Sequence, residues 1–480
     1  MLSSLLVQFL LFTNSTEAST YYMSDVGIRA MGRGGAFVAG ADDISAQWYN
    51  PSALTRIQGS HFQIDLMGVK QEMYFDRQDY PGNGPKVDGN PTDLITDPIR
   101  NGASPLPIPH FGFIHDFGNP DLTVLLGFTT PYATDISYPE GGAQRYSLED
   151  SIVIHTFTGP AVAYKIKPWL SVGVGTSWNY MIVGQSMQVG LQVPFGPCDG
   201  TTEDPQCDIG FEAFTKDNRM FTWNVSATVE SMDERFAAAV MFQPKIKYDA
   251  TGWLKADFSN NLFHTNGTIT SETSEDDYIT IETYLPIIVR TGVLFRPRTD
   301  FEVELSAVYE GWSSMQSLDI TNVDMTIEMI EAVGNAEITD DISLPTNFKD
   351  AYSVRLGWDW DISKVWNIRQ GLMFEATGLK PAYMSPALID RNKIGMGLGA
   401  SWSPTPGWTI DSALFGATMG EWEVTNSKNK QIAVAVDPFG DGGAQVVEGR
   451  DVSDGLYRSS TWLAGFSVTR HIGQSDRWSD

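Results

Sequence analysis

Long segments in which apolar and polar residues alternate are the feature of this sequence that most constrains its fold. In the segment WLSVGVGTSWNY, which begins at Trp169, apolar or aromatic residues alternate with serine, glycine and asparagine. The same alternation recurs in FEVELSAVYE, YSVRLGWDWD and KIGMGLGASW. Successive side chains of a β-strand point to opposite faces of its sheet, so this pattern predicts strands with one apolar and one polar face.

The length of these segments separates two classes of β protein. Strands of soluble sandwiches are typically about five or six residues long, whereas many of the segments here run for ten residues or more. A tilted strand needs about 9–11 residues to cross a bilayer. Aromatic residues also gather near the segment ends, as in the interfacial girdles of membrane barrels. The pattern therefore favours a transmembrane barrel over a soluble sandwich.

Fourteen such segments can be counted, and the connections between them alternate between two to four residues and about 15 to 40 residues. An even strand number, with short turns at one end and long loops at the other, is typical of outer-membrane barrels. We therefore predict an all-β fold, a 14-stranded antiparallel transmembrane β-barrel over residues 59–473, followed by a C-terminal tail at 474–480. The segments are 60–69, 110–118, 121–130, 152–166, 169–183, 221–230, 235–249, 284–297, 301–314, 350–362, 366–377, 392–403, 407–419 and 460–472.

Residues 19–58 precede the first strand and are the candidate to fill the barrel. In lipid every backbone N–H and C=O must be paired, so the sheet must close. Fourteen strands then enclose more space than their own side chains fill. Something must therefore fill the lumen, and the family resemblance described below implies that the stretch GRGGAFVAGADDISAQWYNPSAL, which begins at Gly32, forms an N-terminal hatch that plugs it. The alternative is an ordered plug with no part in gating.

Separate roles are predicted for the residues of this stretch. Its glycines allow tight turns in a crowded lumen. One aspartate of the acidic pair can cap a short helix over ISAQWY. The proline disfavours a helical conformation in the asparagine before it, and so ends that helix. The predicted hatch and gating residues are Gly32, Gly34, Gly35, Asp42, Asp43, Asn50 and Pro51.

The glycines do not form a phosphate-binding loop. A G-x-G-x-x-G motif would need glycine at position 37, where the chain has Phe37, and no Lys-Ser/Thr pair follows. The sequence has no G-x-S-x-G or H-E-x-x-H motif either, and its six histidines are scattered. We therefore expect no catalytic residue, no metal site and no cofactor.

Charge and cysteine content narrow the partners and the compartment. The net charge of −27 argues against nucleic acid, because phosphate binding needs a basic surface. Cys198 and Cys207 are the only cysteines, and their spacing fits no zinc motif. A local disulfide in an oxidising compartment is predicted, with two free thiols as the alternative. Residues 1–18 have a short apolar core, with no Lys or Arg before it, and are predicted to be a signal peptide.

The stretch GIRAMGRGGAFVAGADDISAQWYNPSAL resembles the amino-terminal segment of the long-chain fatty acid transporter family of outer-membrane proteins (FadL/TodX type). Its glycines, its Ala-Asp-Asp patch and its Asn-Pro pair match the family pattern, with Ser52 in place of the usual alanine. Residues 347–363, with the sequence NFKDAYSVRLGWDWDIS, are similar to a family strand, and residues 285–318 to a strand pair that ends in Trp-Ser. The resemblance implies a fourteen-strand barrel with a hatch. It further implies that hydrophobic ligand passes from outer loops to an internal pocket and leaves sideways, through a gap where one strand kinks inward.

Basic residues on the polar faces of the strands are the candidates for binding a ligand carboxylate. A buried carboxylate needs a cation and hydrogen-bond donors, because an unpaired buried charge is very costly. The candidates are Lys245, Lys247, Arg290, Arg355 and Lys393. The alternative is that these bases pair with lumen acids such as Glu302, Glu304, Asp359 and Asp361. The candidates for apolar contact with ligand are Phe37, Trp48, Phe195, Phe211 and Phe214.

The predicted function is uptake of hydrophobic compounds across a bacterial outer membrane by passive diffusion, with long-chain fatty acids as the first expectation. Aromatic hydrocarbons are the alternative substrates within the family. An aqueous porin, a structural barrel and an outer-membrane hydrolase are the alternatives from other classes. The expected partners are hydrophobic small molecules and outer-membrane lipid, and the barrel is expected to be a monomer.

Overall fold

Nearly all of the regular secondary structure in the computed structural model of this chain is β-strand. It describes residues 26–78, 86–87, 90–91, 97–193, 198–199, 203–265, 278–315, 317–321, 325–327, 336–338, 342–345, 347–436 and 444–472. The predicted signal peptide, the C-terminal tail and Phe195 lie outside the described residues.

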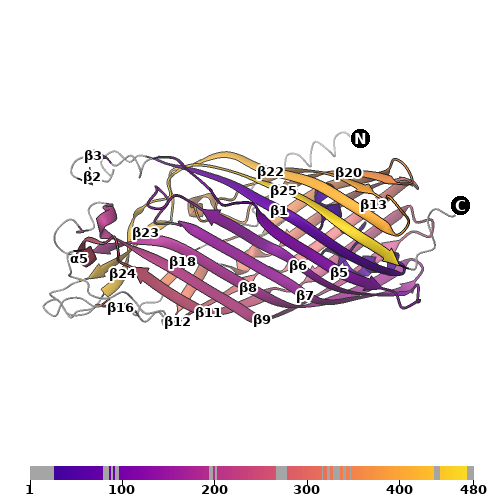
Figure 1. Ribbon diagram of the computed structural model, residues 1–480, viewed down its shortest axis with the longest axis horizontal. Coiled ribbons are helices and arrows are strands. Elements are labelled where there is room, and N and C mark those ends of the chain that lie inside the picture. Colours follow the sequence, from indigo (N-terminus) through magenta and orange to yellow (C-terminus); the bar gives the residue numbers. More distant parts are fainter. Residues whose placement is uncertain are drawn as a thin grey trace.

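Fourteen antiparallel strands close into a barrel, as the alternation predicted (Figure 1). β1 pairs with both β5 and β25, which joins the first and last strands of the sheet. Four of the fourteen are interrupted and consist of two consecutive pieces. In chain order the strands are β1 (Ser60–Arg77), β5 (Leu106–His115), β6 (Leu122–Ser137), β7 (Asp150–Lys167), β8 (Leu170–Gln192), β9 (Asp208–Glu230), β10 with β11 (Phe236–Gln243 and Ile246–Asp257), β12 with β13 (Tyr278–Leu285 and Ile288–Arg298), β14 with β15 (Phe301–Glu310 and Ser317–Thr321), β18 with β19 (Ile342–Pro345 and Ala351–Asp361), β20 (Trp366–Glu375), β21 (Lys393–Trp402), β22 (Trp408–Val424) and β25 (Gly455–Ile472).

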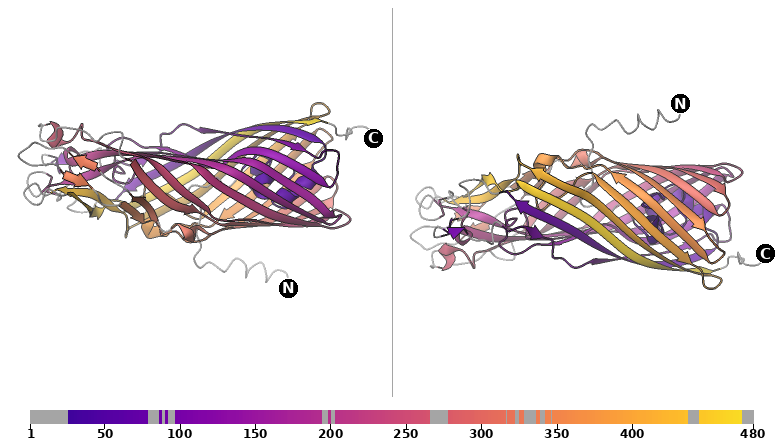
Figure 2. Two further views of the ribbon diagram at one scale, coloured as in Figure 1. Left: turned by 90° about the horizontal axis from the view of Figure 1, so that it is seen from below. Right: turned by 90° about the horizontal axis from the view of Figure 1, so that it is seen from above.

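Several strands extend well past the predicted segments at the long-loop end of the barrel. β8 and β9 have 23 residues each, about twice the number that a bilayer requires. At this end β23 (Lys430–Val436) pairs with β24 (Ala444–Asp451) and runs parallel to β8. Figure 2 shows the extended end opposite the short turns. The remaining small elements are β2 (Lys86–Val87), β3 (Asn90–Pro91), β4 (Ile99–Arg100), β16 (Met325–Ile327), β17 (Ala336–Ile338), α5 (Leu262–Thr265), η2 (Pro205–Cys207), η3 (Trp312–Ser314) and η4 (Pro381–Tyr383).

The two faces of the wall are inverted relative to those of a soluble protein. On β1, Phe62, Ile64 and Leu66 are 45%, 48% and 42% exposed, whereas Gln63 and Asp65 between them are buried. Apolar side chains thus face outward, as on the lipid side of a membrane barrel, while polar side chains face the lumen. The described residues hold no helix that is both long and apolar enough to cross a membrane.

Residues 26–59, which directly precede β1, lie inside the barrel at its short-turn end (Figure 1; Figure 2). We call residues 26–59 the hatch. It contains α2 (Ile28–Gly32), α3 (Ala46–Tyr49) and η1 (Pro51–Arg56), and almost all of its side chains are buried. α2 contacts β21 and β22, whereas η1 contacts β7 and β8. The hatch therefore touches widely separated parts of the wall.

Glycines of the strands make room for the hatch backbone. A Cβ atom at Gly371 would lie 1.9 Å from the carbonyl oxygen of Arg33, and one at Gly397 would lie 2.1 Å from that of Met31. Contacts this short exclude every residue with a side chain unless the hatch moves. The lumen faces of these strands are thus glycine-rich because the hatch packs directly against them.

Candidate functional site

Glu304 of β14 holds the middle of the hatch. Its Oε1 accepts hydrogen bonds from the backbone N–H groups of residues 38 and 39 at 2.6 and 2.8 Å, and its Oε2 accepts one from residue 40 at 2.8 Å. Arg33 of the hatch lies 3.3 Å from Glu304 and 2.5 Å from Glu302. Arg33 and Glu304 are both fully buried. Buried charges are tolerated when they are paired and hydrogen-bonded, so these contacts fix the hatch to the wall.

A second set of ion pairs joins the hatch to strands β19, β20 and β22. Arg29 of the hatch lies 2.7 Å from Asp42 and 3.5 Å from Asp411. Arg369 of β20 lies 2.9 Å from Asp411 and 3.2 Å from Asp359. Glu302, Glu304 and Asp359 therefore pair with arginines of the hatch, β13 and β20, and not with the five bases that were predicted to bind ligand.

The glycines of the hatch serve two different purposes. Gly34 and Gly35 have φ angles of +60° and +75°, in the region that favours glycine, and they turn the chain after α2. Gly32 instead lies against the wall, where a Cβ atom would be 2.9 Å from Cγ of Arg369.

The acidic pair before α3 does not cap that helix, contrary to the prediction. The N-cap residue of α3 is Ser45, and its side chain makes no capping hydrogen bond. Oδ1 of Asp43 accepts hydrogen bonds from N and Oγ of Ser45 at 2.8 and 2.5 Å, so Asp43 forms the turn that leads into the helix. Asp42 forms the ion pair described above. Burial, and then the charges of Asp65 and Asp42, raise the pKa of Asp43 to about 6.

Asn50 and Pro51 redirect the chain at the end of α3. The helix ends at Tyr49, and Asn50 is extended, with φ −169° and ψ 90°. Pro51 then begins η1, since proline suits the first position of a helix. Nδ2 of Asn50 donates hydrogen bonds to the carbonyl oxygen of Val38 at 2.7 Å and to Oγ1 of Thr228 at 2.9 Å. This one amide therefore ties two parts of the hatch to β9.

Buried aromatic side chains gather between the hatch and the wall. The ring of Trp48 packs edge-to-face on Phe157 and Tyr132, with centroids 5.3 and 6.3 Å apart. Tyr132 stacks on His155 at 5.4 Å and meets Trp312 at 6.5 Å. Aromatic rings offer a large apolar area, and such surfaces typically line pockets for apolar ligands. The aromatic site, as we call it, comprises Trp48, Tyr132, His155, Phe157, Trp312 and Phe348.

Charged side chains border the aromatic site. The guanidinium of Arg290 lies over the ring of Trp48, 4.4 Å from its centroid, and donates a hydrogen bond to the carbonyl oxygen of Trp48 at 3.1 Å. Nε1 of Trp312 donates to Glu310 at 2.9 Å. Arg290 and Arg355 both lie close enough to act electrostatically on Glu310. Two of the predicted ligand bases are thus buried beside the aromatic site.

Lys245 and Lys247 do not line the lumen, contrary to the prediction. Lys247 pairs with two acids on the exposed surface, and Lys245 lies over the ring of Tyr284. β10 ends at Gln243 and β11 begins at Ile246, and this break changes which positions face inward. Odd-numbered residues are buried before the break and even-numbered residues after it. Lysines that an unbroken strand would direct inward therefore point outward.

The predicted apolar contacts are also dispersed. Trp48 belongs to the aromatic site, whereas Phe37 is buried within the hatch and packs edge-to-face on Tyr49. Phe211 and Phe214 are half-buried on the outer extension of β9. The structure therefore brings only one of the four described candidates to the aromatic site.

The third barrel strand, β6, bends inward midway along its length. Three steps along β6, from Thr129 to Tyr132, match two steps along β7, from Phe157 to His155. One extra residue on β6 thus forms a β-bulge. Residues 129–134 are all buried, where a straight strand would alternate between its two faces.

β5 and β6 are not paired with each other beyond this bulge. All of residues 99–137 are described, yet the two strands pair only between 111–115 and 124–128. At the limit of the pairing, the rings of Phe111 and Phe128 stack with centroids 4.9 Å apart. The sheet is therefore closed toward the short turn and unpaired above it.

Asn101 closes the opening toward the long loops. Its Nδ2 donates a hydrogen bond to the carbonyl oxygen of Asp135 at 3.1 Å, and its Oδ1 accepts one from the N–H of Ser137 at 2.9 Å. We call the unpaired stretch between residues 103–110 and 129–134 the wall window.

Prolines stand on both sides of the wall window. Pro131 of β6, and Pro107 and Pro109 of β5, have no backbone N–H. β5 stays paired with β1 through both of its prolines, so the missing donors are on the edge that faces β6. Behind the window, Ile108 and Ala133 belong to a buried apolar cluster that includes side chains of α2. The family resemblance implied such a gap, but the sequence did not place it, although prolines directly beside the predicted segments 110–118 and 121–130 were a signal for it.

A polar cavity of about 1130 Å³ lies on the other side of the hatch, among the short turns. Its lining includes charged and hydroxyl side chains such as Asp233, Thr405 and His471. This composition suits water rather than an apolar ligand. Within the described residues, no group of three or more His, Cys, Asp or Glu side chains is arranged to hold a metal ion.

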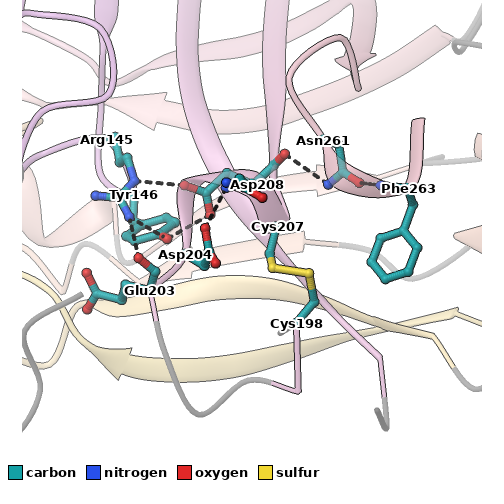
Figure 3. The surroundings of a disulfide bond; sticks show 10 residues. Arg145, Tyr146, Cys198, Glu203, Asp204, Cys207, Asp208, Asn261 and Phe263 are labelled. Atoms are coloured by element: carbon teal, nitrogen blue, oxygen red, sulfur yellow. Dashed lines mark hydrogen bonds and ion pairs between the residues drawn. A yellow bond between two sulfur atoms is a disulfide. The ribbon is translucent and has the colours of Figure 1, made fainter. Parts of the chain in front are cut away.

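A disulfide joins Cys198 and Cys207, whose Cα atoms are 5.5 Å apart (Figure 3). Beside it, the Nε atom of Arg145 pairs with Asp208 at 2.8 Å, and an Nη atom donates to the carbonyl oxygen of Glu203 at 3.4 Å. These contacts hold together the long connection between β8 and β9, well outside the part of the barrel that crosses the membrane.

The closed barrel, the hatch that fills it and the lateral opening define a plugged transmembrane β-barrel. The profile of the family described as outer membrane protein transport protein (OMPP1/FadL/TodX) matches residues 9–448, and the chain belongs to this family. It is therefore an outer-membrane protein of a family of transport channels.

Similar proteins are named for the uptake or transport of hydrophobic compounds. Alkane uptake protein A of Marinobacter nauticus (strain ATCC 49840 / DSM 8798 / CIP 103578 / SP17) is 23% identical over 378 residues, which cover 75% of this chain and 74% of that protein. The crystal structure of a Pseudomonas aeruginosa FadL homologue has a TM-score of 0.74 at 15% identity, and covers 94% of this chain and 100% of that one. The Pseudomonas putida toluene transporter TodX has a TM-score of 0.62 at 13% identity, with 96% and 100% covered. At these identities the two structures show a shared fold.

Proposed function

We propose that this protein admits hydrophobic molecules from its outer loops to the aromatic site, and releases them sideways through the wall window into the membrane. The observation that carries the proposal is the loss of pairing between β5 and β6 at the bulge of β6. Tyr132, next to that bulge, is itself a member of the aromatic site. A ligand on these rings is therefore already at the edge of the opening.

The physical advantage of a lateral route is that an apolar molecule never has to cross water. The lumen below the hatch is polar, and the hatch blocks it. Transfer from the aromatic site to lipid keeps apolar surface away from water, at about 25 cal/mol for each Å². Passive diffusion is sufficient for such a transfer. One chain supplies both the site and the window, so a monomer can carry out the whole process.

Long-chain fatty acids and neutral hydrocarbons are both candidate substrates for this lateral route. The name of the relative from Marinobacter nauticus indicates alkanes, and two of the similar solved structures are named as toluene transporters. Fatty acids remain the expectation from the resemblance of the N-terminal segment.

Deletion of Pro131 is the most direct test of the route. It removes one residue from β6, so that Thr129 and Tyr132 would match Phe157 and His155 step for step. The straightened strand can then pair with β5 and close the window. Uptake of labelled hexadecane, toluene and oleate is measured in cells that make each form. The deletion is expected to abolish uptake of whichever compound the wild type admits.

Pro131→Ala is the matched control, because it changes the same position but keeps the extra residue. We expect it to retain most of the uptake. Equal uptake by the folded deletion variant and the wild type would show that ligand does not leave through the wall window. A porin would instead conduct ions steadily in planar bilayers, in the wild type as well as in the variants.

A further inference from the structure

We propose that the charges beside the aromatic site select uncharged hydrocarbons against carboxylates, and that Glu310 is the residue that sets this preference. The inference rests on the proposed uptake function and names its substrate class. It follows from the partners that the cations at this site already have, and from a buried carboxyl group that is hydrogen-bonded to one of the same rings.

Arg290 already interacts with Trp48 of the hatch. It lies over the face of Trp48, 4.4 Å from the ring centroid, and donates a hydrogen bond to the carbonyl oxygen of the same residue. A guanidinium held over a tryptophan face is stabilised by a cation–π interaction. The arginine therefore supports the ring of the aromatic site, and any ligand carboxylate would have to compete for it.

The other two buried bases at the site already have carboxylate partners. Arg355 lies 3.5 Å from Glu375, and Lys393 lies 3.2 Å from Glu375 and 2.7 Å from Asp390. Arg355 and Lys393 thus share two acids, Glu375 and Asp390. Arg391, two positions before Lys393, lies 3.3 Å from the ring centroid of Trp422.

Glu310 places a buried carboxyl group beside Trp312 of the aromatic site. Its Oε2 accepts the hydrogen bond from Nε1 of Trp312, while its buried Oε1 has no hydrogen-bond partner in the described part of the chain. A fatty acid whose head group approached Trp48 or Trp312 would bring a second negative charge beside it. Like charges in a poorly solvated site repel strongly, and Arg290, Arg355 and Lys393 already interact with the hatch or with other carboxylates.

A hydrocarbon carries no charge, so the Glu310 carboxylate does not repel it. It needs only apolar contact, which the rings supply, and it leaves the ion pairs of Arg355 and Lys393 unchanged. The site is therefore suited to alkanes and to aromatic hydrocarbons, and unsuited to the ionised head group of a fatty acid.

The test compares uptake of radiolabelled hexadecane and oleate by cells that make the full-length wild type, the Glu310→Gln variant or no protein. Glutamine keeps the acceptor for Trp312 and removes one negative charge. The wild type is expected to speed hexadecane entry and to leave oleate entry at the background rate. Glu310→Gln is expected to keep hexadecane uptake and to raise oleate uptake about tenfold, by removing the repulsion.

Glu421→Gln is the matched control, since Glu421 pairs with Arg458 on the exposed outer face. It should leave both rates unchanged, and heat-modifiable gel mobility verifies that each variant is folded. Oleate uptake as fast as hexadecane uptake by the wild type, with no change in Glu310→Gln, would overturn the inference and leave the transport function standing. If neither compound enters faster than without the protein, the proposed function itself fails.

Discussion

Tyr132 of β6 stacks on His155 of β7, its direct partner in the ladder, with ring centroids 5.4 Å apart. The pair stands immediately after the extra residue of β6, so the bulge that opens the wall also places the tyrosine in the aromatic site. Both ring nitrogens of His155 are buried and make no hydrogen bond with the described residues. The wall window and the aromatic site are therefore parts of one structural unit.

Replacing this histidine with an apolar ring should stabilise the protein. Burying a polar group without a partner costs about 1–3 kcal/mol. His155→Phe keeps an aromatic ring against Tyr132 and is expected to raise the free energy of unfolding by an amount in that range. Urea unfolding of the purified protein in detergent measures the change. Hydrocarbon uptake should persist, because the apolar surface is retained.

His115→Phe is the matched control for that substitution. His115 lies on the partly exposed short-turn end of β5 and shares a hydrogen bond of 2.8 Å with Ser60. Its replacement should bring no gain in stability. A loss of stability in His155→Phe would indicate that the histidine has a hydrogen-bonding partner when the protein is in the membrane.

Enlarging a wall glycine should displace the hatch. In Gly371→Ala the new Cβ would lie 1.9 Å from the carbonyl oxygen of Arg33, and only movement of the hatch can relieve that contact. We expect a lower melting temperature and a higher ion conductance in planar bilayers. At Gly68 of β1 a Cβ would meet only one atom within 4 Å, at 3.9 Å, so Gly68→Ala should behave as the wild type. Equal conductance of the two variants would contradict a hatch that seals the lumen.

The barrel could be predicted from sequence because its signal is local. Alternation within each segment identifies a spanning strand without knowledge of its neighbours, and all fourteen predicted segments fall on barrel strands. The extended conformation of Asn50 follows in the same way from the proline after it. These features depend on residues adjacent in the chain.

The lumen and the wall window could not be predicted in this way, because they depend on contacts distant in sequence. The orientation of Lys247 changes with a single break at residues 244–245, two positions that no alternation pattern marks. Which base pairs with Glu304 depends on where the hatch lies, and Arg33 is 271 positions away. The window depends on two strands failing to pair, and each strand alone looks ordinary apart from its prolines.

Neutralising Glu304 should loosen the hatch. Glutamine cannot balance the charge of Arg33, and its amide group would face the N–H groups of residues 38–40. Breaking a buried pair of this kind costs about 3–5 kcal/mol. Glu304→Gln should therefore lower the melting temperature and raise ion conductance, whereas Glu282→Gln, which alters an exposed pair with Lys247, should do neither. Unchanged conductance in Glu304→Gln would mean that the hatch is held mainly by its packing.

Asp43 should make the stability of the hatch depend on pH. Burial and the charges of Asp65 and Asp42 raise its pKa from an ordinary 3.8 to about 6. Between these values the folded state holds a proton that the unfolded state has released. The free energy of unfolding therefore falls as the pH rises from 4 to 6, by at most about 3 kcal/mol for a shift of this size.

Asp43→Asn tests this dependence, because asparagine keeps an oxygen to accept the hydrogen bonds of Ser45 but carries no charge. At pH 4 the aspartate is largely protonated in the folded protein, so variant and wild type should melt at similar temperatures. At pH 7 the buried charge destabilises only the wild type, and the variant should melt higher. Melting curves of the detergent-solubilised protein from pH 4 to 7 measure the difference. Parallel curves over this range would show that the ionised carboxylate is as well solvated in the hatch as in the unfolded chain.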